Sequence, residues 1–233
     1  TERIYGRLGI SGEQNEAFYD GKGDQVFIDN TQTDLQYNRT LDLMGSLAIK
    51  LDDEQDLDLL AQYYDSGNHG NVGIYFPNLH DKAPSNLDDA QIRSGYDTDL
   101  EPRSKRLLFN ANYHHSDVLG QDFYLQGSYR KEDNNFFPFP YYNTGKPQGS
   151  KGVYFAASQQ NFEVTSLKAL FAKQWDSLKL TYGVDLDRER FNAEQSVFDS
   201  AMSSQSGGLD LVTQSKAPRY PSYRVDGQSV YAQ

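Results

Sequence analysis

Between Leu41 and Tyr63 the chain alternates apolar and polar residues almost without interruption, and this feature restricts the fold more than any other. A period of two places the apolar side chains on one face of an extended strand and the polar side chains on the other. The alternation stops only at Asp52–Gln55, so it predicts two strands joined by a tight acidic turn. Each arm has about the 9–11 residues that a tilted strand needs to cross a bilayer, whereas most strands have about 5–6. The pattern therefore predicts a transmembrane β-hairpin.

The same alternation returns along the rest of the chain, which predicts an all-β fold: an antiparallel up-and-down meander of about eight strands. The facing of one strand stays open, because Leu167, Ala169 and Phe171 compete there with Val164 and Leu170 for the apolar face. Besides the hairpin, strands are expected at Arg3–Ile10, Leu107–Tyr113, Phe123–Tyr129, Phe162–Trp175, Leu178–Leu186 and Val225–Gln233.

The connections between these strands alternate between long and short. Loops of more than about 12–15 residues are uncommon in compact soluble domains, whereas outer-membrane barrels have short turns on one side and long loops on the other. The asymmetry favours a transmembrane barrel over the alternative of a soluble sandwich or propeller. The short turns are Asp52–Gln55, Ser116–Gln121 and Asp176–Ser177, and the long, extracellular loops are expected at about 11–34, 66–103, 132–160 and 192–224.

Composition excludes several classes of protein. No apolar run approaches the roughly 18 residues of a membrane helix, so a helical membrane protein is excluded. The net charge of −11 argues against nucleic acid as a partner, because phosphates require a basic surface. The absence of cysteine excludes disulfides and thiolate metal sites. Among the abundant aromatic residues, Phe123 and Trp175 beside short turns and Tyr63 beside a long loop suit the aromatic girdles of a barrel.

The sequence offers no catalytic residues, metal site or cofactor site, so we expect a protein that is not an enzyme. His114 and His115 are adjacent on a strand, point to opposite faces and cannot chelate one metal ion together. Two acidic groups are better explained as solvated charge, because one would face an aqueous lumen and the other lacks the glycine-containing loop of a dedicated Ca²⁺ site. They are Asp185, Asp187 and Glu189, and Asp97, Asp99 and Glu101.

The expected strands at the two ends of the chain are interrupted within their own alternation, and Gln233 follows no terminal aromatic residue. Single-chain barrels close by pairing the last strand with the first. We therefore expect an internal part of a larger barrel. The alternative is a small outer-membrane barrel, complete at eight strands, with a structural or adhesive function.

Several runs resemble the barrel of TonB-dependent siderophore receptors, and the resemblance is strongest to the ferric aerobactin (citrate-hydroxamate) group. It extends over nearly the whole chain in the same order. The runs are Gln32–Gln36, Ser128–Glu132, Phe137–Tyr141, Leu180–Asp185, Asp187–Phe191 and Arg219–Tyr223.

This resemblance implies part of a 22-stranded barrel in the outer membrane of a Gram-negative bacterium. It implies a ferric siderophore of the hydroxamate or citrate type as the transported ligand, with no cofactor. It also implies contact with outer-membrane lipid and lipopolysaccharide, coupling to TonB through an N-terminal plug that these 233 residues do not show, and phage or bacteriocin as further partners.

The segment Asn134–Tyr142 contains five aromatic residues and two prolines within an expected loop. Exposed aromatic patches of this size mark interaction sites, and the prolines reduce the entropy that is lost when a ligand is held. Ferric hydroxamate chelates present an apolar shell and citrate types carry negative charge, so aromatic walls with arginine suit them. The alternative is that the rings brace the loop. The expected ligand-binding residues are Phe136, Phe137, Phe139, Tyr141, Tyr142, Arg130, Arg219, Tyr220, Tyr223 and Arg224.

The alternation also predicts which side chains face lipid and which face the lumen. Arginine at Leu47 should cost about 2–4 kcal/mol near the bilayer midplane, whereas arginine at Ser46 should have a mild effect. Equal costs in an unfolding titration of the two variants, or the reverse order, would show that the register is wrong. The lipid-facing set is Leu41, Leu43, Leu47, Ile49, Leu57, Leu59, Leu107, Phe109, Leu125, Leu178, Leu180 and Val184, and the lumenal set is Asp42, Lys50, Asp58, Arg130, Lys179, Asp185 and Asp187.

Overall fold

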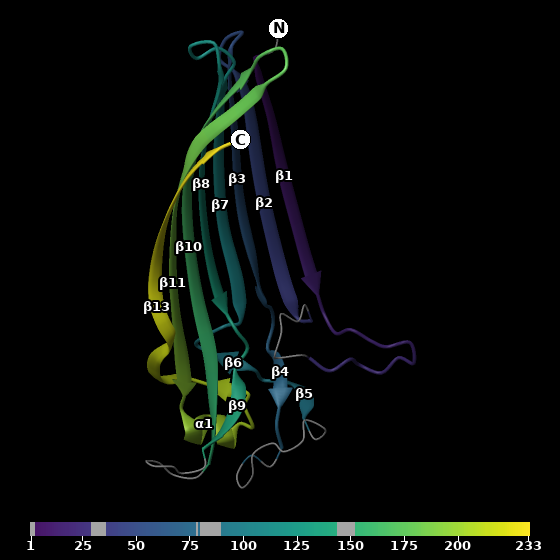
Figure 1. Ribbon diagram of the computed structural model, residues 1–233. Helices are drawn as coiled ribbons and strands as arrows, with labels where there is room; N and C mark the ends of the chain where they lie inside the picture. The colour runs from purple at the N-terminus through teal and green to yellow at the C-terminus, as the bar shows by residue number, and fades with distance from the viewer. Residues whose placement is uncertain (1–2, 29–35, 78, 80–89, 144–151) are drawn as a thin grey trace.

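The computed structural model describes residues 3–28, 36–77, 79, 90–143 and 152–233, and nearly all of them lie in or between β-strands (Figure 1). Parts of the expected long loops, at 29–35, 80–89 and 144–151, lie outside the described residues. The long strands are β1 (Ile4–Asn15), β2 (Asn38–Lys50), β3 (Gln55–Asn68), β7 (Arg103–His115), β8 (Asp122–Asn135), β10 (Gly152–Gln174), β11 (Lys179–Phe198) and β13 (Thr213–Ala232). The short elements are β4 (Val72–Tyr75), β5 (Gln91–Ser94), β6 (Asp97–Thr98), β9 (Phe139–Asn143), β12 (Asp210–Leu211) and α1 (Ser200–Gln205).

The long strands form one antiparallel meander in the order β1-β2-β3-β7-β8-β10-β11-β13, with β9 paired to β10. The all-β prediction and the sequential up-and-down connectivity are therefore confirmed. Three strands are much longer than predicted, because β10 begins at Gly152, β11 ends at Phe198 and β13 begins at Thr213. In these added parts the backbone pairing continues although the alternation of apolar and polar residues is lost. The alternation is lost because the connecting segments bury side chains such as Ser196 and Phe198, both 0% exposed. The last two long loops are correspondingly shorter than the expected ranges.

The register divides the sheet into an apolar face and a polar face, as the sequence predicts. Leu43 is opposite Tyr63, which is opposite Leu107, while Asp42 is opposite Tyr64 on the other face. Every member of the two predicted sets lies on its expected face, except that Leu178 lies in the turn before β11. The open question about β10 is also settled, because Ala169 is opposite Leu125 on the apolar face.

The apolar face ends in a charged border that crosses the strands obliquely. On each strand we take the charged residue of the apolar face that ends the apolar run on the side away from the short turns. From β3 to β11, over four strand pairs, the position of this residue shifts by four residues towards the short turns. With a rise of about 3.4 Å per residue and a strand spacing of about 4.8 Å, the border makes an angle of about 35° with the perpendicular to the strands. This angle is similar to the tilt of about 35–45° that strands of transmembrane barrels have. The charged residues are Asp65, Lys105, Lys131, Glu163 and Arg188.

Aromatic side chains form a continuous row on the apolar face next to the short turns. The ring centroids of Phe123 and Phe171 are 4.8 Å apart, and those of Phe171 and Tyr182 are 5.5 Å apart. Tyr113 contacts Phe123 edge-on at 6.3 Å. The hydroxyl of Tyr182 donates a hydrogen bond to Gln121 at 2.9 Å, so the polar end of the ring points towards the turn. This arrangement is typical of an interfacial aromatic girdle.

The described parts of the four long connecting segments lie at the end of the sheet opposite the short turns (Figure 1). Residues from three of these segments and from the adjoining ends of β10 and β11 pack into one hydrophobic cluster, which we call the loop core. Between the segments, β12 pairs with β6, and the backbone nitrogen of Phe76 donates to the carbonyl of Gly207 at 2.8 Å. The side chain of Gln36, 2% exposed, accepts from the backbone nitrogen of Phe18 at 3.0 Å. The buried members of the loop core are Ile28, Ile74, Phe76, Leu79, Leu100, Val153, Phe155, Ala157, Phe198 and Leu211.

The sheet remains open among the described residues, because β1 and β13 are the two ends of its strand order and do not pair with each other. Closure of eight strands into a barrel requires that pairing. The described strands therefore do not form the closed small barrel that was the alternative expectation. A search of the described residues for helices found none that is long and apolar enough to cross a membrane.

The topology predicts which connections are accessible from outside a cell. A short peptide tag at Gly21, in the first long segment, should be labelled on intact cells that express the full-length protein. Gly21 suits this purpose because no atom lies within 4 Å of the position where its Cβ would be. A tag at Asp53, in the first short turn, should be labelled only after the cells are permeabilised. Labelling of Asp53 on intact cells would contradict this orientation.

The loop core predicts a second result. At Gly208, φ is +88° and an added Cβ would lie 2.6 Å from Cζ of Phe155. Gly208→Ala should therefore destabilise the loop core by about 1–3 kcal/mol, from backbone strain and overpacking. Limited proteolysis should cut the long segments of this variant faster, whereas the matched Gly21→Ala variant should behave like the unaltered protein. Equal cleavage of both variants would show that the loop core does not depend on this close approach.

Candidate ligand-binding surface

One row of side chains crosses the polar face just below the loop core, with one residue from each of six neighbouring strands. Each member is directly opposite the next in the strand pairing, so all six project from the same face. The row starts with charge and aromatic rings on β3 to β8 and continues as rings alone on β10 to β13. Its members are Tyr64, Arg106, Glu132, Phe162, Phe191 and Tyr223.

Arg106 is the cation of this row. Its Nε atom is 3.6 Å from Oε2 of Glu132, and its guanidinium carbon is 5.7 Å from the centroid of the Tyr64 ring. The Arg106 side chain remains 43% exposed, so it holds these partners and still faces solvent on the polar side. Such an arginine can bind an anionic ligand through the nitrogens that Glu132 leaves free, because a guanidinium carries five donors.

The aromatic half of the row is a ladder of three rings. Phe162 and Phe191 have centroids 4.7 Å apart, and Phe191 and Tyr223 stack at 5.2 Å with an interplanar angle of 28°. The hydroxyl of Tyr223 donates to Oε1 of Glu189 at 2.6 Å, which fixes the outermost ring. Because Tyr223 is 42% exposed, the ladder offers a preformed apolar wall to a ligand on the polar face.

A hollow of about 490 Å³ lies against the charged half of this row, which contributes Tyr64, Arg106 and Glu132 to its lining. The adjoining space, lined by Ile28, Phe76 and Phe155, has room for only about 20 Å³, so the loop core closes the far side of the hollow. A hollow of this size is within the range of small-molecule sites. Its lining includes Asn38, Tyr64, Ser66, Ser104, Arg106, Glu132, Asn134, Phe136 and Phe137.

The predicted aromatic segment divides between lining and bracing. Phe136 is 39% exposed and lines the hollow, and its backbone nitrogen donates to the carbonyl of Ser158 at 2.9 Å. Phe137 lines both the hollow and the narrow space under the loop core. Phe139 contacts Tyr141 at 5.7 Å, and Tyr141 stacks on Tyr154 of β10 at 5.5 Å. The side chain of Tyr142 lies outside the described residues. Phe136 and Phe137 therefore line the hollow, whereas Phe139 and Tyr141 brace the segment against β10.

Arg219 of β13 lies beside Tyr141 of β9, although the two are far apart in the sequence. The pKa of Arg219 is raised, first by a hydrogen bond with the hydroxyl of Tyr220 and then by the nearby Tyr141. The guanidinium carbon is 5.7 Å from the centroid of the Tyr220 ring. Arg219 therefore lies next to aromatic rings of β9 and β13, on a strand and not in a long connecting segment.

Two other arginines are placed differently from this group. Arg130 lies on the polar face one row closer to the short turns, where it is exposed and opposite Val164. Arg224 lies on the apolar-face side, opposite Arg190, and its Nε donates to Asp226 at 2.9 Å. The prediction that Arg224 shares a pocket wall with Tyr223 is therefore wrong, because consecutive residues of a strand point to opposite faces.

Sequence reasoning missed five members of this surface, which the register brings into one row. The available signal was an aromatic or charged residue at a polar-face position of a strand. Using that signal requires the pairing of residues on neighbouring strands, and the sequence does not show which face of β10 is apolar. The missed residues are Tyr64, Arg106, Glu132, Phe162 and Phe191.

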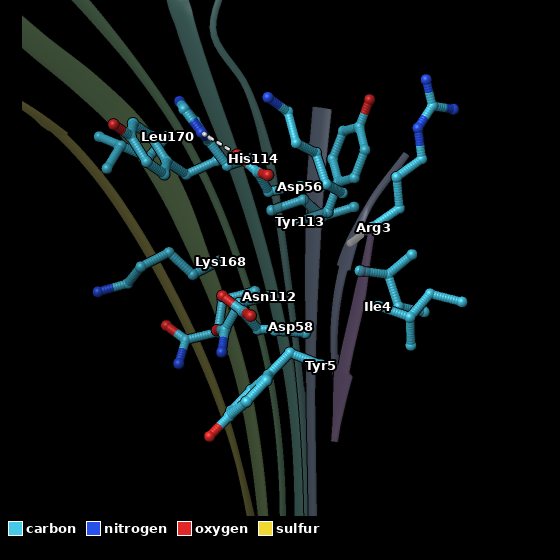
Figure 2. Close-up of a pocket in the computed structure, with 16 residues that line it drawn as sticks. Arg3, Ile4, Tyr5, Asp56, Asp58, Asn112, Tyr113, His114, Lys168 and Leu170 are labelled. Carbon is cyan, nitrogen blue, oxygen red and sulfur yellow. Dashed lines mark ion pairs between the residues drawn. The ribbon is translucent and has the colours of Figure 1, made fainter. Parts of the chain in front are cut away.

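A second hollow, of about 750 Å³, lies on the polar face near the short turns (Figure 2). His114 stacks on Tyr124 with ring centroids 4.5 Å apart, and its Nδ1 and Nε2 atoms lie 3.7 Å from Asp56 and 3.2 Å from Asp122. His115 is on the apolar face, opposite Phe123, so the predicted divergence of the two histidines is confirmed. In the described part of the chain, no group of three or more His, Asp or Glu side chains could hold a metal ion.

The two acidic groups of the sequence have structural partners. Lys168 lies 3.5 Å from Asp185 across the β10–β11 pair. The carboxylate of Asp99 accepts hydrogen bonds from the backbone nitrogen and the hydroxyl of Thr213, both at 2.9 Å. That pair of bonds joins the second long segment to the start of β13, which is a structural function.

Comparison with known proteins identifies the relatives of this chain. A rhizobactin receptor of Rhizobium meliloti (strain 1021) is 39% identical over 235 residues, which cover 100% of this chain. Ferric aerobactin receptors of Klebsiella pneumoniae and Escherichia coli are 35% and 34% identical over 234 residues, again with 100% of the chain covered. The chain is homologous to siderophore receptors. It spans 31% of the length of each of these relatives, and no family model matches it.

Proposed function

We propose that this chain is the ligand-binding part of a barrel that takes up a ferric siderophore across an outer membrane in a TonB-dependent process. One observation carries the proposal: the row on the polar face places Arg106, which lines a hollow, on the same face as a ladder of aromatic rings. The homology to receptors named for rhizobactin and ferric aerobactin supports it independently.

The chemistry of the surface suits a ferric chelate of the citrate-hydroxamate class. The chelate has an apolar outer shell, which the rings of Phe191 and Tyr223 can contact over their faces. It also carries net negative charge, which Arg106 and Arg219 attract. A guanidinium that is already held by rings and a carboxylate loses little freedom on binding, so these contacts favour affinity.

The remaining parts of uptake belong to the full-length protein. Open strand edges seek pairing partners, and further strands can supply them at β1 and β13. Plug-mediated coupling to TonB, and recognition by phage or bacteriocin at the long segments, are further parts of this proposal. The oblique charged border and the aromatic girdle support the placement of the apolar face against lipid and lipopolysaccharide.

The site predicts the effect of removing one charge. In the full-length protein, Arg106→Gln should weaken binding of a ferric citrate-hydroxamate chelate by about tenfold, because one partly exposed charge-assisted contact contributes on the order of 1–2 kcal/mol. Lys168→Gln is the matched control, since Lys168 is on the same face but lies in the hollow near the short turns. Binding is followed by quenching of protein fluorescence, and surface expression by labelling at Gly21.

If Arg106→Gln and Lys168→Gln bind the chelate equally well, the row on the polar face is not the binding surface. If neither the variants nor the unaltered protein binds any ferric chelate, the proposed function itself is wrong.

A further inference from the structure

Two arginines line the hollow beside the charged half of the row, and each has one carboxylate as its partner. Nε and Nη2 of Arg103 donate to the two carboxylate oxygens of Asp65, both at 2.6 Å. Two parallel bonds of this kind make a strong pair with a fixed geometry. Nε of Arg106 and Oε2 of Glu132 are 3.6 Å apart, which is too long for a hydrogen bond. Arg103 is therefore locked to its carboxylate, whereas Arg106 is held loosely.

Glu132 is a carboxylate with few contacts of its own. It lines the hollow, and its side chain is 25% exposed. Within the described residues, its carboxylate accepts no hydrogen bond and has no second ion pair. Arg130 lies two residues along the same face of β8, but the described part of the chain joins it to no carboxylate. The negative charge of Glu132 therefore acts on whatever occupies the hollow.

The rest of the lining leaves this charge uncompensated by other groups. Arg103, Arg106 and Glu132 are the charged side chains among the described residues that line the hollow. Its other polar side chains are amides and hydroxyls, which hydrogen-bond to a ligand without a net charge. They include Asn38, Ser66, Asn68, Ser104, Asn134 and Asn135. Discrimination between ligands of different charge at this hollow therefore depends on the loose pair.

The position of Glu132 changes the free energy of each negative charge on a ligand. A carboxylate bound to the terminal nitrogens of Arg106 would lie about 4 Å from the guanidinium and about 7 Å from Glu132, so attraction exceeds repulsion. A second carboxylate elsewhere in the hollow would lie at similar distances from both charges and would gain nothing from the pair. It would still lose hydration, which is unfavourable for an unpaired charge.

We propose that Glu132 selects ferric chelates by their charge. It allows one carboxylate to bind at Arg106 and disfavours chelates that bring a second carboxylate into the hollow. Glu132 is then a specificity-determining residue that acts through its charge. This inference rests on the proposed function and deepens it, because chelates of the citrate-hydroxamate class can differ in the number of carboxylates that the iron leaves free.

The test compares three forms of one ferric citrate-hydroxamate chelate, which carry two, one or no free carboxylates after stepwise amidation. Each form is titrated into the full-length protein, and binding is followed by quenching of protein fluorescence. Glu132→Gln keeps an oxygen that can face Nε of Arg106 but removes the charge. This variant should bind the chelate more tightly by about fourfold for each free carboxylate, and the form without free carboxylates should bind as before.

Two control variants separate the charge of Glu132 from its geometry and from the net charge of the protein. Glu132→Asp keeps the charge and should keep the preference of the unaltered protein. Asp58→Asn removes one negative charge from the same face, but Asp58 lines the hollow near the short turns, so all three affinities should stay unchanged. A high salt concentration should reduce the effect of Glu132→Gln, because ions screen partly exposed charges.

Two results would overturn the inference. Weaker binding of the charged forms by Glu132→Gln would show that Glu132 only positions Arg106. Equal changes for all three forms, or no change for any of them, would show that the ligand does not sense the charge of Glu132. If instead the unaltered protein binds none of the three forms, the proposed function itself fails.

Discussion

The structure depends on the long ladders of backbone hydrogen bonds between neighbouring antiparallel strands. In a hydrocarbon environment each unpaired backbone group costs several kcal/mol, so a chain that crosses it as strands must pair every one of them with a neighbour. Each pairing in the main sheet is antiparallel, and most keep one register over 12 or more residues, as between β1 and β2. Because the register is fixed, a period of two in the sequence becomes two chemically distinct faces.

The loop core joins connecting segments that are far apart in the sequence. Its residues come from three of the long segments and from the adjoining ends of β10 and β11, and close approaches such as that of Gly208 to Phe155 hold these parts together. A hollow therefore lies beneath it instead of an open end of the sheet. The same packing explains why β10 and β11 continue so far beyond their alternating parts. In these parts both faces of the strands carry buried side chains, so neither face needs the apolar–polar alternation.

Aromatic residues form two different arrangements, one at each end of the sheet and on opposite faces. Near the short turns, Phe123, Phe171 and Tyr182 form a row on the apolar face with a hydroxyl pointing to the turn. Near the loop core, Phe191 and Tyr223 form a ladder on the polar face, next to charge and solvent. The proposed function assigns the first arrangement to positioning the sheet in a bilayer and the second to contacting a ligand. One residue type serves both because a ring combines a large apolar area with, in tyrosine, a polar end.

The sequence by itself determined the all-β meander, the two faces and the placement of short and long connections, because alternation and turn spacing are local and every strand carries them. It also named Phe136, which lines the hollow, and Arg219, which lies beside Tyr141. Only the tertiary structure joined Tyr64, Arg106 and Phe191 into one row, since this depends on which residues of different strands are opposite each other. It also moved Arg224 to the other face and set Arg190 against it. Partners across strands are chosen by register over the whole sheet, and the residues of a single strand do not contain that information.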